Sequence, residues 1–363
     1  MVFSRTIRVP VFTTNYFTAR ADFCAEAERG GARLSCHPIA GRGPNGEELF
    51  IDSASLGHTH PGTLLLLTTG VHGAEAPAGS ALLRLWLMEF ATRMPKDMGA
   101  LLVHALNPWG FAHGRRTNEN NVDLNRNAVS TFPGPVNPEY ARIHRWLNPA
   151  LPPDDGEAFW PGALWHRLRL GTTVLRQAIA AGQYEFPRGL FYGGDRQQES
   201  LEILKRLLND ERFAAVEQVL HLDIHTGLGH RGEYAMLVAE PSTTSLFARL
   251  ARCFGAARVV SNAPSGFTHY AARGTIAAVT ARALPHARVQ ACTLEVGTYS
   301  AVHVLRALRA ENRLYHYGCR DANRAARLRA AFGETFCPAD PAWRKILLEH
   351  GQTVFRQLPA ALV

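Results

Sequence analysis

The chain has 363 residues, of which 46% are hydrophobic and 19% are charged. This length and composition are typical of a globular protein with a large core, and they exclude a disordered chain. The formal net charge of +8 comes from arginines that are scattered along the sequence. Because no run of five or more basic residues occurs, we do not expect a nucleic-acid partner.

Apolar segments and cysteines indicate the compartment. No stretch approaches the roughly 20 apolar residues that a membrane span needs, and Arg5 and Arg8 interrupt the apolar residues at the N-terminus. The six cysteines are spread without CxxC spacing, which indicates free thiols in a reducing compartment. We therefore expect a cytoplasmic protein without a membrane partner.

The order of apolar segments predicts an α/β fold. A helix is expected at about residues 16–28, followed by short strands and the glycine-rich turn GRGPNGEE. Two apolar strands at 64–69 and 101–106 flank a long apolar helix, and this βαβ unit predicts a partly parallel sheet. A polar loop follows, and we expect a helical insertion at about 137–213. Later strands are expected at 218–224, 233–239, 257–261 and 289–296, with a helix at 243–254.

Two potential metal ligands follow the first of these buried strands. Strand 64–69 ends at Gly70, and His72 and Glu75 come next in the sequence HGAE. An imidazole and a carboxylate three residues apart can bind one ion from the same side. A catalytic zinc site built from two histidines and one glutamate then needs one further protein ligand, and water takes the fourth position.

His225 is the candidate for that further ligand. Strand 218–224 ends in HLDIHTG, and strand alternation places His221, Asp223 and His225 on one face. We expect His225 just past the end of this strand, at the same edge of the sheet as His72 and Glu75. For each of these histidines, the alternative is a structural histidine in the core or on the surface.

Charged residues elsewhere could supply the rest of a catalytic site. The polar loop after the second strand contains Arg115, Arg116 and Arg126. A guanidinium group can stabilise an oxyanion or bind a carboxylate through two parallel hydrogen bonds, although a solvated loop remains the alternative. Glu295, in CTLEVGT, lies near the end of an apolar strand. There it could act as a general base beside a metal-bound water, or it could be a surface residue.

Four ordered motifs resemble one known family. They are HGAE, NPWGF with RRTNENNVDLNRN, DIHTG and LEVGT, and they lie between residues 64 and 300. Together they resemble the M14 zinc carboxypeptidase superfamily, in particular its DUF2817 branch, which is related to aspartoacylase and succinylglutamate desuccinylase. The resemblance implies a three-layer α/β/α, zinc-carboxypeptidase-like (phosphorylase/hydrolase-like) fold with a mixed, mainly parallel sheet. It also implies a single zinc-hydrolase domain over residues 1–363.

The resemblance implies a role for each residue of the metal centre. His72, Glu75 and His225 would bind one zinc ion per chain, although this ligand set also accepts other divalent ions. Asp123, in DLNR, would accept a hydrogen bond from a ligand histidine. Glu295 would be the general base.

It also implies residues that contact the substrate. Asn125 and Arg126 would hold a substrate carboxylate. Arg116, or its neighbour Arg115, would stabilise the oxyanion. Tyr270 is the nearest candidate for a tyrosine placed over the substrate, with a packing role as the alternative.

The function that follows is zinc-dependent hydrolysis of an amide (peptide) bond next to a free carboxylate. The partner would be a small peptide. One alternative is a deacylase of aspartoacylase type that acts on an N-acyl amino acid. Another is a non-catalytic binding protein on the same fold, which predicts loss of the base or of a ligand. His72, Glu75, His225 and Glu295 are all present, which favours an enzyme.

Overall fold

The structure is a computed structural model that describes residues 12–153, 159–261 and 272–362. Its centre is one eight-stranded sheet with the strand order β1-β2-β4-β3-β5-β8-β6-β7. The strands are β1 (Arg33–Arg42), β2 (Glu48–Gly57), β3 (Thr63–Thr69), β4 (Met98–His104), β5 (Gln218–Gly227), β6 (Tyr234–Val238), β7 (Val259–Ser261) and β8 (Arg288–Gly297).

The middle of this sheet is parallel. Strands β4, β3, β5 and β8 pair in parallel, whereas β2 is antiparallel to β4 and β6 is antiparallel to β8. Strands β3, β4 and β5 are buried along almost their whole length, which explains their nearly continuous apolar sequences. The predicted mixed, mainly parallel sheet is confirmed.

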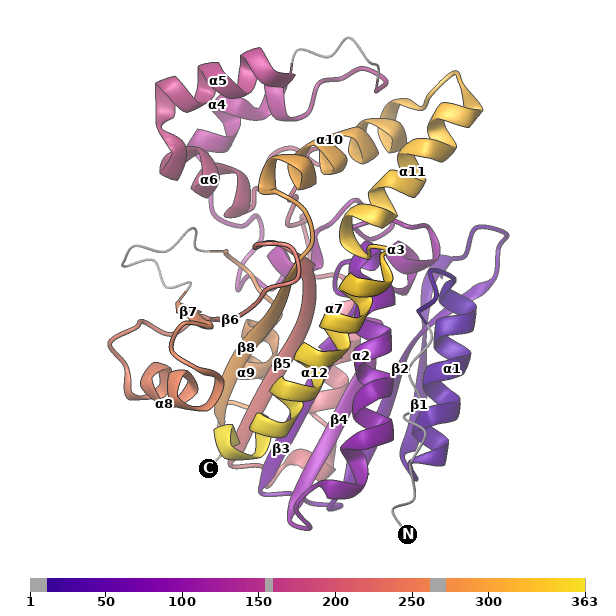
Figure 1. Ribbon diagram of the computed structural model, residues 1–363, viewed down its shortest axis with the longest axis vertical. Coiled ribbons are helices and arrows are strands. Elements are labelled where there is room, and N and C mark those ends of the chain that lie inside the picture. Colours follow the sequence, from indigo (N-terminus) through magenta and orange to yellow (C-terminus); the bar gives the residue numbers. More distant parts are fainter. Residues whose placement is uncertain (1–11, 154–158, 262–271, 363) are drawn as a thin grey trace.

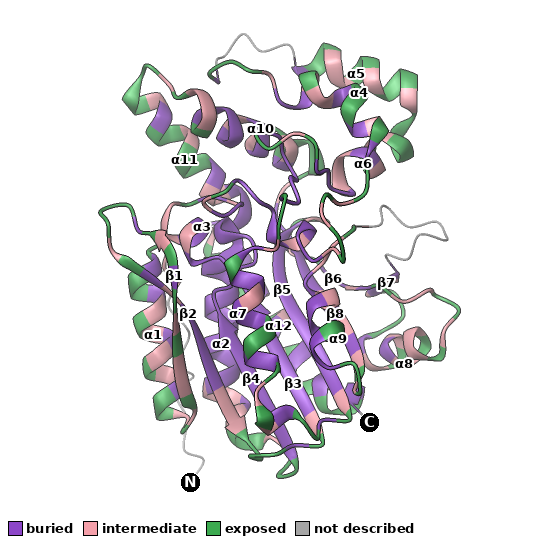
Figure 2. Ribbon diagram, turned by 180° about the vertical axis from the view of Figure 1, so that it is seen from behind, coloured by how far each residue is buried: buried purple, intermediate pink, exposed green. Residues whose placement is uncertain are grey.

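Helices cover both faces of the sheet, which completes the predicted three layers (Figures 1 and 2). On one face lie α1 (Tyr16–Arg29), α2 (Ala76–Glu89) and α12 (Pro341–Leu362), and α8 (Ser245–Phe254) packs beside α12. On the other face lie α7 (Glu199–Leu208) and α9 (Ala277–Ala283). Alternate residues of β3 divide between the two cores, so Leu65 and Leu67 face the first layer while Leu64 and Leu66 face the second.

A group of helices lies beyond the carboxyl ends of the parallel strands (Figure 1). It contains α4 (Pro138–Leu147), α5 (Phe159–Leu170), α6 (Thr172–Ala180), α10 (Ala301–Tyr317) and α11 (Ala322–Phe336). The stretch that was predicted to be helical therefore contributes α4–α6 to this group, whereas α7 packs against the sheet. The short helix α3 (Pro108–Ala112) follows β4 at the same end.

One predicted boundary is wrong. Strand β5 continues to Gly227, so His225 lies inside the strand and not past its end. The reason is tertiary, because β8 pairs with β5 along its full length up to Gly227 and Gly297.

Two further observations concern the cysteines and the helices. All six cysteines are free thiols. Among the described residues, no helix is both long enough and apolar enough to cross a membrane.

Candidate metal centre

The turn after β3 places two of the predicted ligands. Gly70 has a φ of 67°, and a Cβ there would lie 2.6 Å from the Cβ of Ala105, so the chain can turn only with glycine at this position. A Cβ on Gly73 would lie 2.0 Å from the carbonyl carbon of Gly110 in α3. The HGAE turn therefore packs directly against the α3 backbone. This contact fixes His72 and Glu75 at the start of α2.

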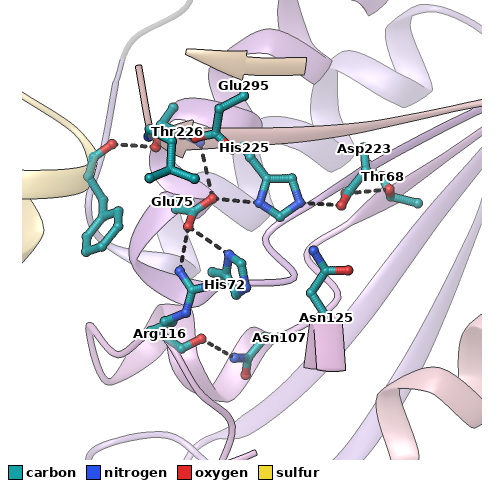
Figure 3. Close-up of polar contacts among 12 residues, drawn as sticks. Thr68, His72, Glu75, Asn107, Arg116, Asn125, Asp223, His225, Thr226 and Glu295 are labelled. Atoms are coloured by element: carbon teal, nitrogen blue, oxygen red, sulfur yellow. Dashed lines mark hydrogen bonds and ion pairs between the residues drawn. The ribbon is translucent and has the colours of Figure 1, made fainter. Parts of the chain in front are cut away.

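The three predicted ligands come together at this end of the sheet. One ligand atom from each of His72, Glu75 and His225 lies within 4.8 Å of the others, and each residue is 3% exposed. Glu75 lies between the two imidazoles in Figure 3, with Oε1 2.7 Å from Nδ1 of His72 and Oε2 2.9 Å from Nδ1 of His225. Among the described residues, no other group of His, Cys, Asp and Glu side chains has this arrangement.

A carboxylate orients each imidazole from the opposite side. Nε2 of His72 lies 3.1 Å from Oδ1 of Asp123, and Nε2 of His225 makes a short contact with Oδ2 of Asp223. Each Nε2–H can therefore donate to an aspartate, which leaves Nδ1 directed at Glu75. The contact with Asp123 is the one that the resemblance implied, whereas no role was predicted for Asp223.

The donor set fits a divalent cation. When Nε2 of each histidine donates to an aspartate, each Nδ1 needs a proton or a cation between itself and the Glu75 carboxylate. Burial alone would lower the pKa of His225, but Asp223 and Glu75 raise it well above its usual value. Burial would likewise raise the pKa of Glu75, but His72 and His225 hold it below its usual range. Two imidazole nitrogens and a carboxylate oxygen are ligands that zinc and similar ions accept.

The two adjacent arginines point to different places. Arg116 lies beside the cluster, with Nη1 3.3 Å from Oε1 of Glu75 and Nη2 3.1 Å from Oδ2 of Asp123. Although burial would raise it, Arg116 and His72 hold the pKa of Asp123 well below its usual range. Arg115 instead pairs with the buried Glu311 of α10. Of the two candidates for the oxyanion role, only Arg116 lies near the ligands.

Strand pairing brings Glu295 to the same place. The register of β5 and β8 sets Glu295 directly opposite His225, and Figure 3 shows it beside the cluster. Its Oε1 accepts a hydrogen bond from the backbone N–H of Leu228 at 2.9 Å. Burial, together with the Glu75 carboxylate, raises the pKa of Glu295 to about 7. A carboxyl group with such a pKa can both accept and return a proton near neutral pH.

Asn125 and Arg126 lie in the short turn after Asp123, and their polar groups contact the backbone. Oδ1 of Asn125 accepts a hydrogen bond from the N–H of Ile276 at 3.1 Å. Nε of Arg126 donates to the carbonyl oxygen of Ala180 at 3.0 Å, and Nη1 donates to the carbonyl oxygen of Asn125 at 2.7 Å. The bond to Ala180 connects the turn to the end of α6, and the bond from Ile276 connects it to the start of α9. Tyr270, the third residue predicted to bind the substrate, lies outside the described residues.

Comparison with known proteins identifies the family. The model of the family described as "Protein of unknown function (DUF2817)" matches residues 12–350. The chain belongs to the DUF2817 family. This part of the sequence-based prediction is confirmed.

Solved structures that resemble this DUF2817 protein include enzymes. Carboxypeptidase A from Helicoverpa armigera is 14% identical, with a TM-score of 0.47 over 87% of this chain and 73% of that one. Succinylglutamate desuccinylase from Chromobacterium violaceum is 16% identical, with a TM-score of 0.40 over 91% of this chain and 76% of that one. No curated protein matched. Assignment of an activity to the DUF2817 protein therefore depends on its own site.

The DUF2817 site also contains residues that were not predicted from the sequence. Phe191 has a φ of 57°, a rare conformation for a bulky residue. Its ring centre lies 5.4 Å from Cζ of Arg116 and 5.9 Å from Cζ of Arg126, so it packs against both cations. Thr68 donates a hydrogen bond to Oδ1 of Asp223 at 2.7 Å. The sequence signal for Asp223 was its place on the same strand face as His225, but the contact depends on the pairing of β3 with β5.

Proposed function

We propose that this DUF2817 protein is a zinc-dependent hydrolase that cleaves an amide bond next to a free carboxylate, as a carboxypeptidase does. The observation that carries the proposal is the buried cluster of His72, Glu75 and His225 with Glu295 opposite His225. A binding protein without activity predicts loss of the base or of a ligand, whereas the three ligand residues and Glu295 are all present and lie together. The substrate would be a small peptide.

His72, Glu75 and His225 would hold the zinc ion. When bound, such an ion polarises a carbonyl group and lowers the pKa of water. The Glu295 carboxylate would take a proton from the attacking water and return it to the leaving amine, which its raised pKa supports. The guanidinium of Arg116, next to Glu75, would donate hydrogen bonds to the developing oxyanion.

The carboxyl-terminal group of the substrate would be held near Asn125 and Arg126. Both residues lie in the turn that begins at Asp123, whose side chain contacts His72. Phe191 packs against Arg116 and Arg126 and would keep their side chains in place. A guanidinium group suits this role because it can form two parallel hydrogen bonds with a carboxylate.

The first experiment separates metal binding from catalysis. Zinc content is measured by mass spectrometry in the wild-type protein, in His72→Ala and in Glu295→Gln. We expect about one zinc per chain in the wild type and in Glu295→Gln, and loss in His72→Ala, because His72 is a zinc ligand and Glu295 is not. The absence of zinc from the wild type, even after zinc is added back, would contradict the proposal.

The second experiment tests catalysis with a panel of small peptides and N-acyl amino acids. Glu295→Gln should lose turnover by about 10²–10⁴-fold, the usual contribution of a general base. Glu233→Gln is the matched control, because it makes the same change at an exposed glutamate just before β6. Full activity in Glu295→Gln would refute its role as the base. Cleavage of acylated amino acids alone would favour a deacylase over a peptidase.

A further inference from the structure

A chain of buried hydrogen bonds leads away from His225. Oδ2 of Asp223 contacts Nε2 of His225, and Oδ1 of Asp223 accepts a hydrogen bond from Oγ1 of Thr68. The same Oγ1 lies 2.9 Å from Nε2 of His221, and Nδ1 of His221 lies 3.0 Å from Oγ1 of Thr280. These five residues belong to β3, β5 and α9, and none is more than 4% exposed.

The chemistry of these groups determines which group donates in each hydrogen bond. The Asp223 carboxylate can only accept, so the single hydroxyl proton of Thr68 is donated to it. Thr68 must then accept its other bond, from a proton on Nε2 of His221. A neutral imidazole carries one proton, so Nδ1 of His221 is bare and accepts from the hydroxyl of Thr280.

These hydrogen bonds require a neutral imidazole at position 221, and the ring of His221 is neutral. Burial lowers the pKa of His221 to about 4, and the nearby His225 acts in the same sense although Asp223 opposes it. At neutral pH the ring therefore has one donor and one acceptor. In the opposite tautomer, the bare Nε2 of His221 would compete with Asp223 for the only proton of Thr68.

We propose that His221 and Thr280 are positioning residues for His225, and that they act through Thr68 and Asp223. Thr280 donates to Nδ1 of His221 and so stabilises the Nε2–H tautomer, in which His221 donates to Thr68 and leaves the Thr68 proton for Asp223. Asp223 then keeps both its bonds and holds His225 by Nε2–H, with Nδ1 directed at Glu75. This inference rests on the metal site of the proposed function, but not on the reaction.

The test is zinc affinity in Thr280→Val, measured by competition with a chromophoric chelator, without any assay of activity. Valine fills nearly the same volume but removes the hydroxyl that donates to Nδ1 of His221. We expect zinc affinity to fall by about tenfold, the lower end of the range for residues that support a metal ligand. Thr280→Ser keeps the hydroxyl and should bind zinc as the wild type does.

Two substitutions of Thr68 test the next hydrogen bond, the one between Thr68 and Asp223. Thr68→Val removes the donor to Asp223 itself, so it should weaken zinc binding more than Thr280→Val does. Thr68→Ser should restore the affinity. Urea unfolding of the metal-free variants shows whether each one is folded. If the valine variants lost zinc affinity through a general loss of packing, the serine variants, which keep the hydroxyl, would not restore that affinity.

A second readout needs no metal. Nitrogen NMR of histidine-labelled, metal-free protein reports which ring nitrogen is protonated, and His221→Gln identifies the signal. We expect the Nε2–H form of His221 in the wild type and a larger share of the Nδ1–H form in Thr280→Val. An Nδ1–H form in the wild type, or unchanged zinc affinity in Thr280→Val, would overturn the inference. Failure of the wild type to bind zinc would refute the proposed function, while the NMR result would still test the direction of the hydrogen bonds.

Discussion

At the scale of single residues, the centre holds each histidine between two carboxylates. Nε2 of His225 faces Asp223, and Nδ1 faces Glu75. In the metal-free protein this geometry favours the protonated ring, which is why the pKa of His225 is well above its usual value. A metal ion and a proton therefore compete for the same nitrogen.

This competition predicts that zinc binding releases protons. Below the raised pKa of His225, zinc must displace a proton from the ring. For each proton displaced, the zinc affinity falls about tenfold when the pH is lowered by one unit. The affinity should therefore rise with pH and level off once His225 is deprotonated. Calorimetry in two buffers of different ionisation enthalpy measures the number of protons. An affinity that does not change between pH 6 and pH 8 would contradict this prediction.

The adjacent arginines provide a second prediction, because Arg115 and Arg116 differ in their partners. Arg116→Ala removes the cation next to Glu75 and should lower kcat by on the order of 10²-fold, the cost of losing one oxyanion donor. Arg115→Ala leaves Glu311 buried without its partner and should lower the free energy of unfolding by about 3 kcal/mol. Urea unfolding and steady-state kinetics on both variants separate the two effects. A larger loss of kcat in Arg115→Ala would show that the roles are reversed.

At the scale of elements, β4 carries a buried histidine between two helices. His104 stacks on Phe23 of α1 at 4.7 Å between ring centres, and its Nε2 lies 2.9 Å from Oγ of Ser80 in α2. Burial lowers the pKa of His104 from 6.5 to about 4, because the charged ring cannot be hydrated there. The neutral ring is thus part of the packing of both helices.

The pH dependence of stability follows from this shift. Above pH 6.5 the ring is neutral in both the folded and the unfolded state, so it contributes nothing to the pH dependence. Below pH 6.5 the unfolded chain binds the proton first, and stability is lost until the pH reaches about 4. The loss is about 2 kcal/mol at pH 5 and about 3 kcal/mol in full. Urea unfolding of the wild type and of His104→Gln at pH 7 and pH 5 measures this loss, which is the extra decrease in the free energy of unfolding of the wild type. Equal pH dependence in the two proteins would contradict this assignment.

The elements themselves were largely predictable, because buried parallel strands require continuous apolar sequences. Residues 64–69 and 218–224 were recognised as strands in this way, and both are strands in the sheet. The end of β5 was not predictable, since it is set by pairing with β8. The contact of Asp223 with Thr68 was missed for the same reason, because the sequence does not show which residues of two strands lie opposite each other.

At the scale of the whole molecule, the metal centre joins distant segments. His72 and Glu75 follow β3, His225 lies in β5, and Glu295 lies in β8. The motifs allowed all four to be predicted as one site, because the carboxyl ends of parallel strands meet at one edge of a sheet. The conformation of Phe191 had no comparable signal, since its φ of 57° depends on the surrounding tertiary structure.

A metal ion that joins these segments should stabilise the whole chain. At a free zinc concentration of 100 times Kd, binding to the folded state adds about 2.7 kcal/mol to the free energy of unfolding. Thermal unfolding with zinc and with a chelator measures the shift in Tm. His72→Ala should show almost no shift, because it lacks one ligand. An equal shift in both proteins would mean that zinc binds elsewhere.

The pairing of Glu295 with His225 has a consequence for how this family can diverge. Loops between strands can change in length without moving either side chain relative to the sheet. One residue inserted into β8 before Glu295 would instead turn its carboxyl group to the opposite face, towards α2 and α12. Insertions and deletions should therefore be tolerated in the connections of active homologues and excluded from the paired parts of β5 and β8.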